Sequence, residues 1–174
     1  MKHLTLIRHA KSSREQSLLR DTERPLSPRG AADAPLIARH LRTLPNFAPD
    51  ALVTSPAVRA RTTAEVIQQE ATLTHLPLRE EPRIYEAPVN TLATVLREFP
   101  DNVQNVVLFG HNPGLENLAN WLCGQRAIYG LRTGGVIMLA LDLASWTEVR
   151  IGCASLITYF YPAQIGGGKD AHGE

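Results

Sequence analysis

Two short apolar runs in this chain each end in a histidine. The first covers residues 4–9, LTLIRH, and the second covers residues 106–111, VVLFGH. Apolar, β-branched runs that stop at polar residues are typical of buried strands in a parallel sheet. Because ligands of open α/β sheets bind beyond the carboxyl ends of such strands, the two runs predict that His9 and His111 lie in one cleft.

Two arginines accompany these histidines. Arg8 directly precedes His9, and Arg59 follows a third strand-like run, residues 51–55, in the expected first turn of a helix. A guanidinium group binds phosphate through paired hydrogen bonds, and burying such a cation at an apolar strand end without an anion is costly. The sequence therefore predicts a pocket for a tetrahedral anion such as phosphate, sulfate or a phosphoryl group.

Strand-like and helix-like patterns alternate along most of the chain. Strands are expected at residues 4–8, 51–54, 78–84, 106–110, 136–141 and 156–161, and helices near residues 28–44, 58–71, 89–99 and 113–122. This order predicts an α/β fold of three layers, α/β/α, with a mainly parallel central sheet, helices on both faces and antiparallel closing strands. The 174 residues fit a single domain over residues 1–162, and the glycine-rich residues 163–174 predict a flexible C-terminal tail.

The composition narrows the classes of partner. The 18 Lys and Arg residues almost balance the 17 Asp and Glu residues, so bulk charge gives no reason to expect a nucleic-acid or membrane partner. The first residues lack the apolar stretch of roughly 7–15 residues that a signal peptide needs. The two cysteines, Cys123 and Cys153, are too few for a disulfide framework. We therefore expect a cytoplasmic protein.

Three motifs, in this order, resemble those of the histidine phosphatase (phosphoglycerate-mutase-like) superfamily. They are LIRHA at residues 6–10, SPAVRARTT at residues 55–63 and GHNPG at residues 110–114. Within that superfamily, RHAKS at residues 8–12, Asp21 and RPLSPRG at residues 24–30 are similar to the SixA-type phosphohistidine phosphatases. The resemblance implies a phosphoglycerate-mutase-like fold, no cofactor, and a nucleophilic His9 that accepts a phosphoryl group before water removes it.

Elementary chemistry agrees with these roles. Phosphoryl transfer needs positive charge around the non-bridging oxygens, which Arg8, Arg59 and His111 can supply without a metal. The resemblance also implies a carboxylate that protonates the leaving oxygen, for which Glu86 is the candidate general acid, and Lys11 is a candidate substrate contact. Arg61 lies on the same predicted helix as Arg59 but points about 200° away from it, toward solvent or a carboxylate.

A metal site is the other interpretation of a histidine cluster. The sequence contains no His-x-His or His-Glu-x-x-His spacing, and two arginines would repel a cation. We therefore expect a metal-independent phosphatase that works through a phosphohistidine enzyme intermediate.

The expected substrate is phosphohistidine in a signalling protein, such as a histidine-phosphotransfer domain. The segments that join His9, Arg59 and His111 are filled by predicted helices and strands, which leaves no capping domain to enclose a small ligand. Two alternatives stay open: a phosphatase for small phosphate esters, and a non-catalytic phosphate-binding module.

Overall fold

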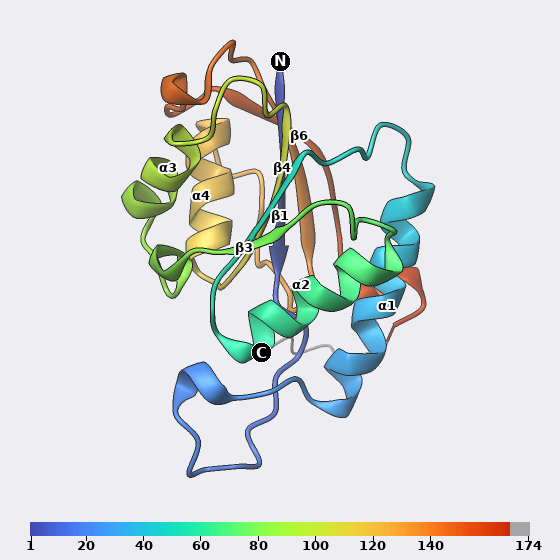
Figure 1. The fold of residues 1–174 in the computed structure, drawn as a ribbon. Coiled ribbons are helices and arrows are strands. Elements are labelled where there is room, and N and C mark those ends of the chain that lie inside the picture. Colours follow the sequence, from blue (N-terminus) through green and yellow to red (C-terminus); the bar gives the residue numbers. More distant parts are fainter. Residues whose placement is uncertain (168–174) are drawn as a thin grey trace.

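The computed structural model describes residues 1–167, which form a six-stranded sheet between two layers of helices (Figure 1). The strands are β1 (Lys2–Arg8), β2 (Ala51–Thr54), β3 (Leu78–Glu80), β4 (Asn105–Gly110), β5 (Val136–Leu141) and β6 (Ala154–Phe160). The α-helices are α1 (Pro28–Thr43), α2 (Val58–Glu70), α3 (Val89–Arg97) and α4 (Gly114–Cys123). The strands lie in the order β3-β2-β4-β1-β5-β6.

The sheet is mixed, and its parallel part is central to the fold. Strands β3, β2, β4 and β1 run parallel to one another, whereas β5 and β6 are added in antiparallel pairs. The predicted α/β fold, with a mainly parallel sheet and antiparallel closing strands, is confirmed. All four parallel strands end at one edge of the sheet, which is where the sequence predicts a cleft.

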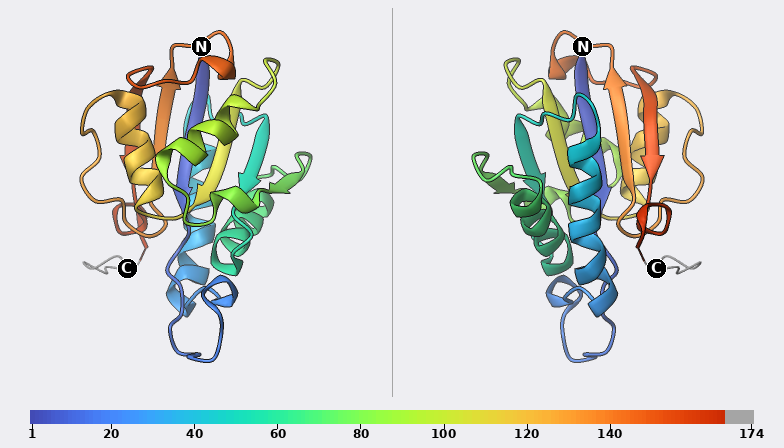
Figure 2. Two further views of the ribbon diagram at one scale, coloured as in Figure 1. Left: turned by 90° about the vertical axis from the view of Figure 1, so that its left-hand side faces the viewer. Right: turned by 90° about the vertical axis from the view of Figure 1, so that its right-hand side faces the viewer.

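Side chains along the strands point alternately to the two faces of the sheet, so the core has two parts. In β1, Leu4 and Leu6 pack with α3 and α4, whereas Ile7 packs with α1 and α2 on the other side. Successive side chains of a strand point to opposite faces, so fully apolar strands need helices on both sides. Figures 1 and 2 show the two helix layers covering the two faces of the sheet.

The start of α1 is attached to the chain that leaves β1. Ser27 caps the helix, because its Oγ accepts a hydrogen bond from the backbone N–H of Gly30 at 3.1 Å, and Pro28 is the first helical residue. Gly30 lies directly against Lys11: a Cβ atom at this position would be 2.1 Å from the Lys11 carbonyl oxygen. Only glycine permits this contact, which holds residues 10–12 beside the end of the sheet.

Two expectations about the ends of segments were wrong. The strand expected over residues 78–84 is limited to β3, because Pro82 has no N–H for a sheet and instead begins the 3₁₀ helix η2 (Pro82–Ile84). Of the predicted tail, residues 163–165 belong to the 3₁₀ helix η4 (Pro162–Ile165), and Ile165 packs against the core cluster to which α1 and α2 contribute. The remainder of that tail, residues 168–174, lies outside the described residues, and the single domain over 1–162 stays a prediction.

Within residues 1–167, no helix has both the length and the apolar character needed to cross a membrane.

Candidate active site

The strand ends bring the two predicted histidines together. Arg8 of β1 pairs in register with Gly110 of β4, so His9 and His111 are the next residues on two adjacent strands. Their ring centroids are 5.4 Å apart, and each residue is only 5% exposed. The predicted proximity of His9 and His111 is therefore observed.

The His9 ring has a defined orientation. Its Nδ1 lies 2.7 Å from the backbone carbonyl oxygen of Ala10. A carbonyl oxygen can only accept, so Nδ1 carries the proton and Nε2 retains its lone pair. Burial, together with the nearby charges of His111, Arg8 and Arg59, lowers the pKa of His9 from 6.5 to about 3, although the bond to Ala10 acts to raise it. At neutral pH, His9 thus presents an unprotonated Nε2.

His111 is held between a hydroxyl group and a guanidinium group. Its Nε2 lies 2.8 Å from Ser55 Oγ, at the end of β2, and its Nδ1 lies 3.5 Å from Nη2 of Arg59. Because a guanidinium group only donates, Nδ1 is the acceptor and Nε2–H donates to Ser55. Burial, and then the charge of Arg59, lowers the pKa of His111 to about 4.

Arg59 lies in the first turn of α2 and is 3% exposed. Its Nη1 donates to the backbone carbonyl of Asp21 at 2.6 Å, and its Nη2 donates to Oδ2 of Asp21 at 2.9 Å. Its Nε is buried and has no hydrogen-bond partner among the described residues. A buried donor of this kind calls for an acceptor, and the oxygen of a bound anion would satisfy it.

Arg8 and Thr63 complete the surroundings of His9. Nη1 of Arg8 donates to the carbonyl of Leu131 at 2.8 Å, and the charge of Arg8 helps to lower the pKa of both histidines. The Thr63 hydroxyl accepts from the backbone N–H of Ala10 at 3.0 Å and donates to the carbonyl of Arg59 at 2.8 Å. One threonine of α2 thus connects the backbone beside His9 to that of Arg59.

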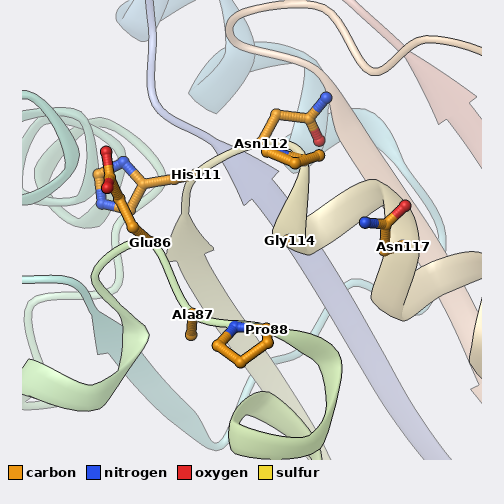
Figure 3. A pocket seen from close by; sticks show the side chains of 8 residues that line it. Glu86, Ala87, Pro88, His111, Asn112, Gly114 and Asn117 are labelled. Atoms are coloured by element: carbon orange, nitrogen blue, oxygen red, sulfur yellow. The ribbon is translucent and has the colours of Figure 1, made fainter.

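Glu86 lines a cavity that opens beside His111 (Figure 3). The cavity has a volume of about 440 Å³ and is lined by Glu86, Ala87, Pro88, His111, Asn112, Pro113, Gly114 and Asn117. Glu86 adopts a φ of 47°, a left-handed conformation that is uncommon outside glycine and often marks a functional site. Gly114 allows the turn to approach α4, because a Cβ there would be 2.5 Å from the Ala87 carbonyl oxygen.

Lys11 and Arg61 take different positions. The Lys11 carbonyl accepts hydrogen bonds from the N–H and hydroxyl of Ser27, so this residue contributes to the site region through its backbone, and its predicted substrate contact stays a prediction. Arg61 forms ion pairs with Glu65 and Glu80, each at 3.4 Å. The prediction that Arg61 turns away from Arg59 toward a carboxylate is confirmed.

Several residues that contact the site have no role predicted from the sequence. Asp21 lies in the 3₁₀ helix η1 (Asp21–Glu23) and binds Arg59, Arg24 and the hydroxyl of Tyr85. The Tyr85 ring in turn lies edge-on to His111, at 5.3 Å. In the sequence, Asp21 and Arg24 belong to a motif that resembles the SixA-type branch, and Tyr85 precedes Glu86, but neither observation indicates a contact with the site. Ser55 could have been predicted, since it directly follows a strand as His9 does.

The arrangement can bind an anion and attack it. The guanidinium groups of Arg8 and Arg59, the latter with a buried unpartnered Nε–H, and the imidazole of His111 lie close enough to His9 to lower its pKa. Residues 1–167 contain no group of three or more His, Cys, Asp or Glu side chains placed to hold a metal ion. Arg8 and Arg59 bring two positive charges close to His9.

The two buried histidines predict a loss of stability in acid. Their pKa values are near 6.5 in the unfolded chain but about 3 and about 4 in the folded protein, so the unfolded state binds more protons as the pH falls below 6.5. The free energy of unfolding should then fall by about 1.4 kcal/mol per pH unit for each ring. Urea denaturation between about pH 6 and pH 4.5 should show a shallower dependence in His111→Gln than in the unmodified protein. Equal slopes would contradict the neutral, buried state of His111.

Comparisons with known proteins agree with this geometry. The family model of the histidine phosphatase superfamily (branch 1) matches residues 4–112. An uncharacterized protein of Mycobacterium tuberculosis is 32% identical over 166 residues, covering 90% of this chain and 99% of that protein. The structure of SixA from Agrobacterium tumefaciens, a suggested phosphohistidine phosphatase, matches with a TM-score of 0.79 at 25% identity, covering 92% of this chain and 98% of that one.

The fold is also shared with a phosphatase for a small molecule. A mycobacterial glucosyl-3-phosphoglycerate phosphatase matches with a TM-score of 0.64 at 16% identity, covering 92% of this chain and 98% of that one. The resemblance of the sequence motifs to the superfamily and its SixA-type branch is confirmed. The family model covers more than half of the chain, and the chain belongs to the histidine phosphatase superfamily (branch 1), as a phosphatase with the phosphoglycerate-mutase-like fold.

Proposed function

We propose that this protein is a metal-independent phosphatase that removes the phosphoryl group from phosphohistidine in another protein, through a phosphohistidine intermediate on His9. The observation that carries the proposal is the hydrogen bond from His9 Nδ1 to the Ala10 carbonyl. This bond assigns the proton to Nδ1 and leaves Nε2 as the nucleophile. The low pKa of His9 keeps that nitrogen unprotonated at neutral pH.

The site residues divide the reaction between them. Arg8, the unpartnered Nε of Arg59 and His111 bind the phosphoryl oxygens, whose negative charge is spread in the transition state. Nε2 of His9 forms a bond to phosphorus while the bond to the leaving nitrogen or oxygen breaks. Water then attacks the phosphohistidine, releases phosphate and restores His9. His111 accepts from Arg59 when its proton is on Nε2; in its other neutral tautomer, Nδ1–H donates to an anion and Nε2 accepts a hydrogen bond from the Ser55 hydroxyl.

A protein substrate is supported by the fold and by the likeness to SixA. Within residues 1–167 the chain forms one sheet with its covering helices and no additional domain over the strand ends. The side chain of Asp21, which contacts Arg59, is 45% exposed, so the anion site lies close to the surface. A phosphorylated side chain on another protein can therefore approach it. A histidine-phosphotransfer domain is the partner that we propose.

A small phosphate ester is the second candidate substrate, and Glu86 is the observation in its favour. A carboxyl group at the wall of a cavity of about 440 Å³ beside His111 is placed to protonate an alkoxide leaving group. In this case the cavity would hold the organic part of the ester. The reaction on His9 would be the same.

Glu86→Gln should separate the two candidate substrates. An alkyl phosphate has a poor leaving group, so loss of a positioned acid should slow phosphoenzyme formation by roughly 10²–10⁴-fold. With phosphohistidine, the rate of phosphoenzyme formation should fall much less, since the leaving imidazole ring can already carry a proton. Single-turnover formation of the phosphoenzyme is the appropriate measurement, because it excludes effects on the later water attack. Equal, large losses on both substrates would contradict the distinction, and no loss on either would make Glu86 a residue of the cavity rim.

The proposed function is tested by comparing kcat/KM for the two classes of substrate. The purified protein is assayed with a phosphorylated histidine-phosphotransfer domain and with a panel of sugar and nucleotide phosphates, with and without a chelator. We expect the phosphohistidine protein to give the highest kcat/KM, and chelation to leave it unchanged. Preference for one ester would favour the second candidate. Loss of turnover with the chelator and its return with a divalent metal would overturn metal independence.

A further inference from the structure

Asp21 places a carboxylate at the mouth of the anion site. The loop that carries it extends beyond the carboxyl ends of the parallel strands and returns next to the start of α2 (Figure 1). Oδ2 of Asp21 accepts hydrogen bonds from Arg59 Nη2 and from the Tyr85 hydroxyl, and Oδ1 accepts from Arg24 Nε at 3.1 Å. Arg24 also donates to the Ser12 hydroxyl at 2.8 Å, which fixes the loop to the chain after β1.

These contacts keep the carboxylate ionised. Partial burial acts to raise the pKa of Asp21, but hydrogen bonds from Tyr85, Arg59 and Arg24 lower it well below its usual range. Asp21 therefore cannot donate a proton to a leaving group at neutral pH. A negative charge so close to Arg59 also opposes the binding of a phosphate dianion. The site contains a charge that phosphate binding alone does not need.

The carboxylate also retains an unused acceptor position. Its two oxygens together offer about four acceptor positions, and the described residues fill three of them: two on Oδ2 and one on Oδ1. The side chain is 45% exposed, so an incoming group can reach the carboxylate. A positively charged or N–H-bearing group of the substrate is the chemistry that suits this position.

The position of Asp21 fits the leaving group. In-line transfer places the leaving atom on the side of phosphorus opposite to the attacking nitrogen. His9 follows β1 at the carboxyl edge of the sheet, and η1 lies beyond that edge, against α2 (Figure 1). A leaving group that departs away from the strand ends would meet the loop that carries Asp21.

We propose that Asp21 is a specificity-determining residue that accepts a hydrogen bond from the free ring nitrogen of an N-phosphorylated imidazole, and so selects phosphohistidine over phosphate esters. This inference rests on the proposed function and names the group that distinguishes its substrate. Tyr85, Arg59 and Arg24 hold the carboxylate in place for this contact.

The transfer step then balances without an added acid. The substrate imidazole carries phosphorus on one nitrogen and a proton on the other, and Asp21 accepts a hydrogen bond from that N–H. The bond from phosphorus to His9 Nε2 forms, and the electron pair of the breaking P–N bond returns to the substrate ring. The ring keeps its proton and leaves as neutral imidazole. An ester oxygen has no such proton, and an ionised carboxylate cannot supply one.

Asp21→Asn tests the inference with two small substrates, phosphoimidazole and p-nitrophenyl phosphate. The first carries the ring N–H, and the second has a leaving group that needs no proton. We expect the ratio of their kcat/KM values to fall by about 10- to 100-fold, the range for a hydrogen bond to a charged group. Glu23→Gln is the matched control, because it removes the same charge two residues away on η1, from a side chain paired with the exposed Arg20.

A purely structural role for Asp21 predicts a different result. Misplacement of Arg59 would lower kcat/KM for both substrates and weaken inhibition by tungstate. The ratio of the two kcat/KM values would then stay within about threefold of the wild-type ratio, and this result would overturn the proposal. Tyr85→Phe provides a second test, since it removes one donor to Asp21 and should lower the ratio in the same direction but less. With phosphoimidazole, the alkaline limb of kcat/KM should also move to lower pH in Asp21→Asn, because the carboxylate favours the protonated ring.

Failure of the proposed function would look different from failure of this inference. If wild-type protein labels His9 from p-nitrophenyl phosphate but does not turn over phosphoimidazole or phosphohistidine, the substrate class is wrong, and this inference is wrong with it. If phosphohistidine is turned over and the substrate ratio is unchanged in Asp21→Asn, the proposed function stands and only the role of Asp21 is overturned.

Discussion

His9→Ala should abolish the covalent phosphoenzyme and reduce turnover by about 10⁴-fold or more, because loss of a nucleophile removes the whole two-step pathway. Wild-type protein quenched during turnover should carry one phosphoryl group on His9. The adduct should be labile in acid and stable in alkali, as expected of a phosphorus–nitrogen bond. Rapid-quench mass spectrometry measures both the amount and the position of the label.

The matched control for His9 is His75→Ala, which removes an exposed imidazole from the segment between α2 and β3, before the amino end of that strand. It should label and turn over like the wild type. His9→Ala should still bind tungstate, because Arg8, Arg59 and His111 remain. Undiminished labelling or turnover in His9→Ala would show that the nucleophile is another residue, and the mechanism proposed above would be wrong.

Arg59→Ala should lower kcat/KM by about 10²–10³-fold, the usual cost of removing one donor to a developing oxyanion. The effect should reach this size because the buried Nε is free to bind the anion and because Nη2 also contacts His111. Steady-state kinetics measures the loss of kcat/KM, and tungstate inhibition measures the loss of anion binding. Arg59→Lys should recover little, since a single ammonium group cannot reproduce the spaced donors of the guanidinium.

Arg61→Ala is the control for Arg59. It removes the same group from the same helix, two residues farther along, where the side chain is 40% exposed and paired with Glu65 and Glu80. Its activity should stay close to that of the wild type, and its stability should change by about 1 kcal/mol at most. Similar losses in Arg59→Ala and Arg61→Ala would indicate a general effect of helix charge and not a contact with substrate.

The sequence predicted the parallel strands and the meeting of His9 with His111 because both follow from local patterns. A buried parallel strand is apolar along its whole length, and any residue that follows it appears at the carboxyl edge of the sheet. Arg59 was predicted for the same reason, since it follows β2 by one turn of α2. The prediction that His9, His111 and Arg59 meet at one edge of the sheet did not depend on the course of the loops.

Asp21 could not be placed in the same way. It lies in a polar loop without periodicity, and its contacts with Arg59 and Tyr85 join residues that are far apart in the chain. Such contacts depend on where the loop turns, which side-chain types alone do not specify. The strand expected over residues 78–84 was too long because Pro82, which cannot donate a hydrogen bond to a sheet, follows closely and the pairing ends at Glu80. The ordered η4 was missed because the glycines that follow it resemble a linker.

Three groups of the site are anchored by main-chain oxygens. The carbonyl of Ala10 orients His9, that of Asp21 binds Arg59, and that of Leu131 binds Arg8. A carbonyl is supplied by every type of amino acid, so the geometry of these three contacts tolerates divergence at the supplying position wherever the backbone path is kept. At Leu131, which is 2% exposed, only packing limits the choice of side chain. Relatives with different residues at positions 10 and 131 can therefore retain the same arrangement of reactive groups, whereas at Asp21 the side chain also binds Arg59.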